Sequence, residues 1–214
     1  MSMKEMAVDY PGCRFLGIDS TPLRPTVALP ENCRFELASI LDDIAHPDGA
    51  FDYVHHRSLV TEIPRERWHS YIKECVRLCA PGGWVEMMES SYRIYEGGPI
   101  SQKLNRCMEQ VFSAWDLDVG IVDSLNEHMH EAGLVKLTVE DVRLPLGDWS
   151  GPAGELALKS QLMLFAELAP FFTSVCGMTP SEVGQMIAEA GEEFKRSYAH
   201  TRFRIFVGRK PKSA

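Results

Sequence analysis

Polar side chains that could do chemistry follow one buried strand pattern. The segment FDYVHHR, residues 51–57, ends in His55, His56 and Arg57. An imidazole titrates near neutral pH and can take a proton from a hydroxyl, and a guanidinium can hold an anionic group. We therefore predict that His55 and His56 are catalytic and that Arg57 contacts substrate. Alternatively, backbone hydrogen bonds satisfy each His and a nearby acid pairs with the Arg. Adjacent side chains of a strand point to opposite faces, which argues against a metal site.

Acids stand near the ends of two other strand patterns. Asp19 follows the run RFLGI, and Glu89 ends the run GGWVEMME. Ligands of open α/β sheets bind at the carboxyl ends of the strands. We predict that Asp19 accepts the hydroxyl protons of a ribose, the alternative being an ordinary solvated acid, and that Glu89 contacts substrate. Glu86 lies within an apolar run, so it must be paired, at a sheet edge or functional.

The elements that must position these side chains alternate along the first half of the chain. Apolar runs rich in β-branched and aromatic residues predict strands at 13–19, 33–39, 51–57 and 82–89. Between the last two, Ile72, Cys75, Val76 and Cys79 fall on one helical face, and the segment Pro81-Gly82-Gly83 stops the helix. Strand, helix and strand at this spacing predict a βαβ unit and a parallel sheet.

The second half of the chain is mostly helical. Helical patterns run from about 97 to 133, where Gly133 suits a helix C-terminus. A strand is predicted at 135–146, an apolar helix at 154–175 interrupted near Pro170, and a further helix with Thr179 as its N-cap and Glu182 three residues later. The last strand pattern covers 201–210, so the helical block at about 154–198 is interpreted as an insertion over one end of the sheet.

The length, composition and net charge of the chain argue against several classes of protein. A chain of 214 residues, 45% hydrophobic and 24% charged, suits one domain or one domain with a cap. A net charge of -8 argues against a nucleic-acid-binding protein. No run approaches the ~20 apolar residues of a membrane span, and the start lacks the apolar core of a signal peptide. Six cysteines without a CxxC pair predict free thiols and a cytoplasmic location.

The order of these motifs resembles a known family. The segments FLGIDSTP, CRFELASI, FDYVHHR and RLCAPGGWVEMME, in this order, are similar to class I S-adenosylmethionine-dependent methyltransferases of the small-molecule and secondary-metabolism branch. The likeness covers about residues 5–90 and continues more weakly to the end. It implies a single Rossmann-like α/β domain over residues 1–214, with helices on both faces of a sheet ordered 3-2-1-4-5-7-6. Residues 1–95 would be the cofactor-binding half and residues 96–214 the acceptor half, with a helical cap before an antiparallel last strand.

The resemblance also implies S-adenosylmethionine as cofactor and a small-molecule acceptor. Asp19 and Ser20 would lie at the ribose, Ser39 and Ile40 at the adenine, and His55 with His56 near the methionine part. Ser39 stands where the family usually has an acid, and a hydroxyl bonds an adenine amine more weakly than a carboxylate does.

One further departure concerns the start of the chain. The family's first strand and its glycine-rich turn are not recognisable, and residues 1–12 match only the end of the helix that follows them. Without that strand, two sheet edges would be left unpaired. We therefore expect a fragment, a misplaced start or a degenerate homologue, or else a gap filled by dimerisation or strand exchange.

These patterns leave three functional hypotheses. The first is methyl transfer to a small molecule, impaired by the missing segment, or a regulator built on the same fold. The second is a catalytically inactive subunit that binds a partner protein, and a homo- or heterodimer is compatible with the sequence. The third is an NAD-dependent oxidoreductase, which shares the ribose acid but whose catalytic Tyr and Lys pattern is not recognisable here.

Overall fold

The computed structural model describes residues 3–24 and 26–212. The chain divides into two compact units, Met1–Pro47 and Asp48–Ala214, which are described separately. The predicted division into a cofactor half and an acceptor half at residue 95 is a functional one and stays a prediction.

The first unit is a small α/β element. Helix α1 (Met3–Asp9) is followed by strands β1 (Phe15–Asp19) and β2 (Cys33–Leu37), which pair in parallel from Phe15 opposite Cys33 to Asp19 opposite Leu37. The side-chain amide of Asn32 donates to the carbonyls of Ala7 and Cys13, both at 3.0 Å. These bonds tie the end of α1 to the loop that leads into β1.

The second unit contains a four-stranded sheet ordered β3-β4-β6-β5. Its strands are β3 (Phe51–Arg57), β4 (Cys79–Ser90), β5 (Val135–Pro145) and β6 (His200–Arg209). Strands β3 and β4 are parallel, which confirms the predicted βαβ unit, and β6 is antiparallel to both of its neighbours. This order reproduces the 4-5-7-6 part of the expected sheet.

The first and second units carry separate sheets. Among the described residues β1 pairs only with β2, and β3 pairs only with β4, so each has one unpaired edge. The prediction that the family's first strand and glycine loop are lacking is not tested by this arrangement and stays a prediction.

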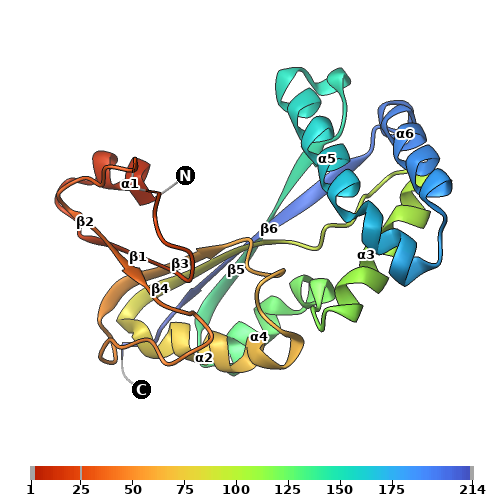
Figure 1. Cartoon of the computed structure of the whole chain (residues 1–214). Coiled ribbons are helices and arrows are strands. Elements are labelled where there is room, and N and C mark those ends of the chain that lie inside the picture. Colours follow the sequence, from red (N-terminus) through yellow and green to blue (C-terminus); the bar gives the residue numbers. More distant parts are fainter. Residues whose placement is uncertain (1–2, 25, 213–214) are drawn as a thin grey trace. The chain divides into compact units, whose positions relative to one another are not determined.

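Helices α2 (Trp68–Leu78) and α4 (Leu125–Glu131) lie on the same side of the sheet in Figure 1. Helix α2 follows a short 3₁₀ turn, η1 (Arg65–Arg67), and buries Trp68, Ile72 and Cys75. Cys79 was predicted on the helix but has extended backbone and begins β4, because it pairs with Phe51 across the parallel ladder. Helices on both faces of the sheet stay a prediction.

Three longer helices gather beyond one end of the sheet in Figure 1: α3 (Pro99–Ala114), α5 (Pro152–Cys176) and α6 (Pro180–Ser197). The 3₁₀ turn η2 (Val119–Asp123) follows α3, and η3 (Asp148–Ser150) precedes α5. Helices α5 and α6 separate β5 from β6, which is the predicted insertion. Helix α6 begins with the predicted capping box of Thr179 and Glu182.

The predicted interruption of α5 at Pro170 is wrong. The helix continues through Pro170 to Cys176. A proline removes one backbone donor, a cost that tertiary packing can outweigh, and the neighbouring Leu168 and Phe172 are buried.

A carboxylate of α6 caps α3. Glu193 accepts the amides of Ile100 at 3.0 Å and Ser101 at 2.7 Å, and also the Ser101 hydroxyl at 2.7 Å. These are amides of the first helical turn, which lack partners within the helix. A larger residue at position 98 would displace this carboxylate, because a Cβ on Gly98 would come within 2.6 Å of it.

Neither a membrane-spanning helix nor a cluster of metal ligands is found among the described residues. No helix among them is both long and apolar enough to cross a membrane. Within the same ranges, no group of three or more His, Cys, Asp or Glu side chains could hold a metal ion.

Candidate functional site

The two histidines at the carboxyl end of β3 occupy opposite faces of the sheet, as the alternation of a strand predicts. The His55 side chain is 32% exposed and stacks on Tyr53 with ring centroids 6.1 Å apart. The His56 side chain is 6% exposed and packs against Trp68 and Tyr71 of α2. The two predicted catalytic histidines therefore have different surroundings.

His55 is paired with a carboxylate on the neighbouring strand. Its Nδ1 lies 3.2 Å from Oε1 of Glu86, directly opposite in the ladder. Burial lowers the pKa of His55, and although Glu86 opposes this shift, the net pKa lies below its ordinary value. At neutral pH the imidazole is therefore uncharged. The contact with Glu86 favours the tautomer with hydrogen on Nδ1, which leaves Nε2 as a proton acceptor.

Tyr53 completes this group from two residues earlier on the same face. Burial first, and then its interaction with Glu86, raise the pKa of Tyr53, so the phenol stays protonated and donates to the carboxylate. Sequence reasoning missed this residue. The period of two along a strand would have placed Tyr53 beside His55.

Arg57 continues the same face one step closer to the end of the strand. It is exposed and lies opposite Met88 in the ladder. No carboxylate of the described residues forms an ion pair with it. Tyr53, His55 and Arg57 therefore present a phenol, an imidazole and a guanidinium along one face of β3.

Glu89 has a different environment from the other predicted site residues. Its side chain is fully buried, and its two oxygens accept the amides of Leu59 at 2.6 Å and Val60 at 3.1 Å. Its predicted substrate contact stays a prediction.

In the first unit, Asp19 and Ser39 lie at the same edge of the two-stranded sheet. Asp19 is exposed, and its Oδ1 accepts the amide of Thr21 at 2.8 Å. Ser39 follows β2, is half-buried with Ile40, and accepts the amide of Leu41 at 3.1 Å. Ser20 is exposed beside Asp19. The four residues predicted around a nucleoside are thus brought to one edge.

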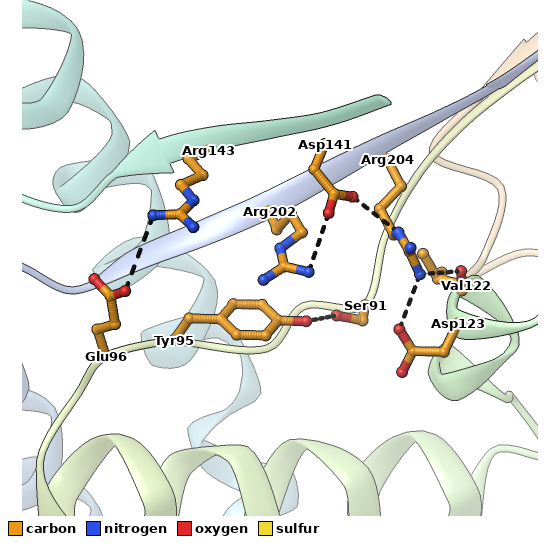
Figure 2. A network of polar contacts seen from close by, with 9 residues as sticks. All are labelled: Ser91, Tyr95, Glu96, Val122, Asp123, Asp141, Arg143, Arg202 and Arg204. Carbon is orange, nitrogen blue, oxygen red and sulfur yellow. Dashed lines mark hydrogen bonds and ion pairs between the residues drawn. The ribbon is translucent and has the colours of Figure 1, made fainter. Parts of the chain in front are cut away.

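A polar network fixes the segment that leads from β4 to α3, as Figure 2 shows. Arg204 of β6 donates to Asp141 of β5 at 2.9 Å and to the carbonyl of Val122 at 3.2 Å. The guanidinium of Arg202 lies 4.3 Å above the ring of Tyr95, whose hydroxyl meets Ser91 at 3.4 Å. The network connects the segment before α3 and the turn η2 to the last two strands, β5 and β6.

A cleft of about 690 Å³ lies between α3, the residues that follow β4, and η2. Its walls include Tyr92, Arg93, Asn105 and Asp118. None of the predicted site residues lines it, so the cleft and the polar face of β3 are described as separate features.

Comparison with known proteins gives the chain its relatives, although no model of a protein family matches it. It is 29% identical to the methyltransferase pytC of Aspergillus terreus over 94% of this chain and 66% of that protein. It is 34% identical to the methyltransferase str2 of Strobilurus tenacellus over 52% of this chain and 40% of that protein. The secondary metabolism regulator laeA of Coprinopsis cinerea is 34% identical over 44% of this chain and 23% of that protein.

Solved structures show the same fold. The phosphoethanolamine N-methyltransferase 2 of Haemonchus contortus, in complex with S-adenosyl-L-methionine, matches 97% of this chain and 45% of that chain, with a TM-score of 0.54 and 14% identity. The [4+2]-cyclase SpnF matches 94% of this chain and 68% of that chain, with the same TM-score and 17% identity.

The chain is therefore similar to methyltransferases of the fungal secondary-metabolism type, such as its relatives from Aspergillus and Strobilurus. The chain spans just under two thirds of the length of pytC.

The first unit offers polar groups for the nucleoside end of S-adenosylmethionine. Oδ1 of Asp19 is engaged by Thr21, whereas no hydrogen bond to its Oδ2 is formed within the described residues. An exposed carboxylate oxygen at the end of a parallel strand, with a serine beside it, suits a ribose diol. These residues therefore fit the ribose of S-adenosylmethionine.

Proposed function

We propose that this chain is the catalytic part of an enzyme that transfers a methyl group from S-adenosylmethionine to a small molecule. The observation that carries the proposal is the polar face of β3, where Glu86 lies at Nδ1 of His55, in a chain similar to fungal methyltransferases. Asp19 and Ser20 would hold the ribose, and Ser39 and Ile40 would flank the adenine.

Methyl transfer requires alignment more than acid–base chemistry. When bound, S-adenosylmethionine supplies a methyl carbon already activated by a positively charged sulfur, so positioning the acceptor accounts for much of the rate. Nε2 of His55 takes the proton from an acceptor hydroxyl, and Glu86 stabilises the imidazolium that forms. Arg57, exposed on the same face, holds an anionic group of the acceptor.

Ligand binding separates this proposal from its alternatives. The full chain is heated with S-adenosylmethionine, S-adenosylhomocysteine or NAD, and unfolding is followed by dye fluorescence. A ligand at 100 times its Kd stabilises the folded state by about 2.7 kcal/mol. We expect stabilisation by the two adenosyl compounds only. Stabilisation by NAD alone would support the oxidoreductase, and stabilisation by none would favour the inactive subunit.

The role of His55 is tested by release of S-adenosylhomocysteine in the presence of a panel of phenols and alcohols. General-base catalysis contributes about 10²–10⁴-fold, so His55→Gln should lower turnover by about that factor without changing stabilisation by the cofactor. His69→Gln, at an exposed position of α2, is the matched control. Equal turnover in both variants would remove His55 from the mechanism.

A further inference from the structure

The turn that follows β3 is held in a strained conformation. Ser58 has a φ of 58°, in the left-handed region that few residues other than glycine adopt. Its amide donates to the carbonyl of Met88 at 2.9 Å. Such residues persist only where the surroundings hold them, and they cluster at functional sites.

The surroundings that hold this turn are supplied by Glu89. The amides of Leu59 and Val60, directly after Ser58, both donate to its carboxylate. Successive amides beside a left-handed residue form a concave site for an anion. In this chain the concavity is filled by a carboxylate from the neighbouring strand, which is fully buried.

His56 and Tyr71 close the other side of this carboxylate. Nδ1 of His56 lies 2.8 Å from the Tyr71 hydroxyl, and Nε2 lies 3.2 Å from Oε1 of Glu89. Burial, followed by the nearby Cys75 and Glu89, raises the pKa of Tyr71, so the phenol that bonds to His56 stays protonated. Nε2 of His56 makes no aligned hydrogen bond among the described residues. The amides of Leu59 and Val60 therefore fix Glu89 more strongly than His56 does.

We propose that Glu89 is a positioning residue, which fixes the turn after β3 and thereby the exposed ends of His55 and Arg57 on that strand. This inference rests on the proposed methyl transfer, which it deepens. A direct contact with substrate would require a free oxygen at the surface, whereas Glu89 is buried with both oxygens engaged.

The first test is amide hydrogen exchange in the full chain, followed by mass spectrometry of peptides that cover residues 55–63. In Glu89→Gln one oxygen is replaced by an NH₂ group that faces an amide donor. We expect exchange at Leu59 and Val60 to accelerate at least tenfold. Glu193→Gln is the matched control, because it alters a carboxylate that binds two amides elsewhere and should accelerate only Ile100 and Ser101.

The second test measures a pKa, which a loss of stability alone would not change. The Cε1 proton of His55 is titrated by NMR in the same proteins. A loosened turn exposes His55, so its lowered pKa should rise toward the ordinary value in Glu89→Gln and stay unchanged in Glu193→Gln. If Glu89→Gln does not fold, Glu89→Asp keeps the charge but shortens the reach, and should show smaller changes in the same direction.

Unchanged exchange at Leu59 and Val60, or an unchanged His55 titration, would overturn the inference. Both measurements are made without cofactor or acceptor. A failure of S-adenosylmethionine to stabilise the chain would therefore count against the proposed function and leave the exchange result standing.

Discussion

Two carboxylates of the second unit bind consecutive amides of a segment far away in sequence, and they differ in burial. Glu89 holds the turn after β3 and is fully buried. Glu193 holds the first turn of α3 and is only partly buried. The hydrogen bonds are similar, but water can replace a partner of Glu193 more readily than one of Glu89. Burial, rather than the number of bonds, should therefore decide what each carboxylate contributes.

The largest effect is expected for Glu89→Ala. The change leaves the amides of Leu59 and Val60 without acceptors beside a side chain that water does not reach. We expect a loss of about 3 kcal/mol of unfolding free energy, since each unsatisfied buried group costs about 1–3 kcal/mol. Urea denaturation measures it. A loss no greater than that of Glu193→Ala would contradict the role given to burial.

A smaller effect is expected for Glu193→Gln, about 1–2 kcal/mol, because the amide oxygen keeps one acceptor and solvent reaches the site. Gly98→Ala should weaken the same contact by sterics, because its Cβ would meet the carboxylate. If Gly98→Ala is neutral in urea denaturation, the contact in solution is looser than the structure shows.

The contribution of Glu193 to stability should depend on pH, which gives a further way to compare it with Glu89. Burial alone would raise the pKa of Glu193, but hydrogen bonds from the Ser101 hydroxyl and from the amides of Ile100, Ser101 and Gly98 outweigh it and lower the pKa. A lowered pKa stabilises the folded state above the ordinary value of 4.5, and this contribution is lost as the pH falls through the folded-state pKa. The stability difference between the parent chain and Glu193→Gln should therefore be full at pH 6 and shrink below pH 4.5. A constant difference would assign the effect to packing.

The smallest effect is expected at the N-terminus of α6, where the capping box is exposed. Thr179→Ala should cost about 1 kcal/mol, the usual value for loss of an N-cap side chain. Thr179→Ser keeps the hydroxyl and is the control. A larger loss than that of Glu193→Gln would reverse the order proposed here.

Much of this second unit follows from local patterns. The alternation of β3 predicted opposite faces for His55 and His56, and the spacing of Ile72, Cys75 and Val76 predicted α2. The capping box of α6 was predicted because its two residues are three positions apart. Such features depend on neighbours in sequence, which a single chain displays directly.

The two carboxylate contacts could not be predicted in the same way. Glu89 and the amides it binds are about 30 residues apart, and Glu193 lies more than 90 residues from the amides that it binds. An acid at the end of a strand looks the same in sequence whether it faces a ligand or a buried turn. The end of α2 was misplaced for a related reason, because the pairing of Cys79 with Phe51 outweighed the helical period.

The distribution of two residue types gives each unit its own optical reporter. All four tryptophans, at 68, 84, 115 and 149, lie in the second unit, so tryptophan fluorescence comes from that unit alone. Of the six cysteines, all within the described residues, only Cys13 is exposed, and it lies in the first unit. Burial raises the pKa of Cys75 to about 12 and that of Cys176 to about 11, which slows their reaction with maleimides. A dye on Cys13 and the native indoles can therefore be read in one denaturant series, where coincident midpoints would mean that the units unfold together.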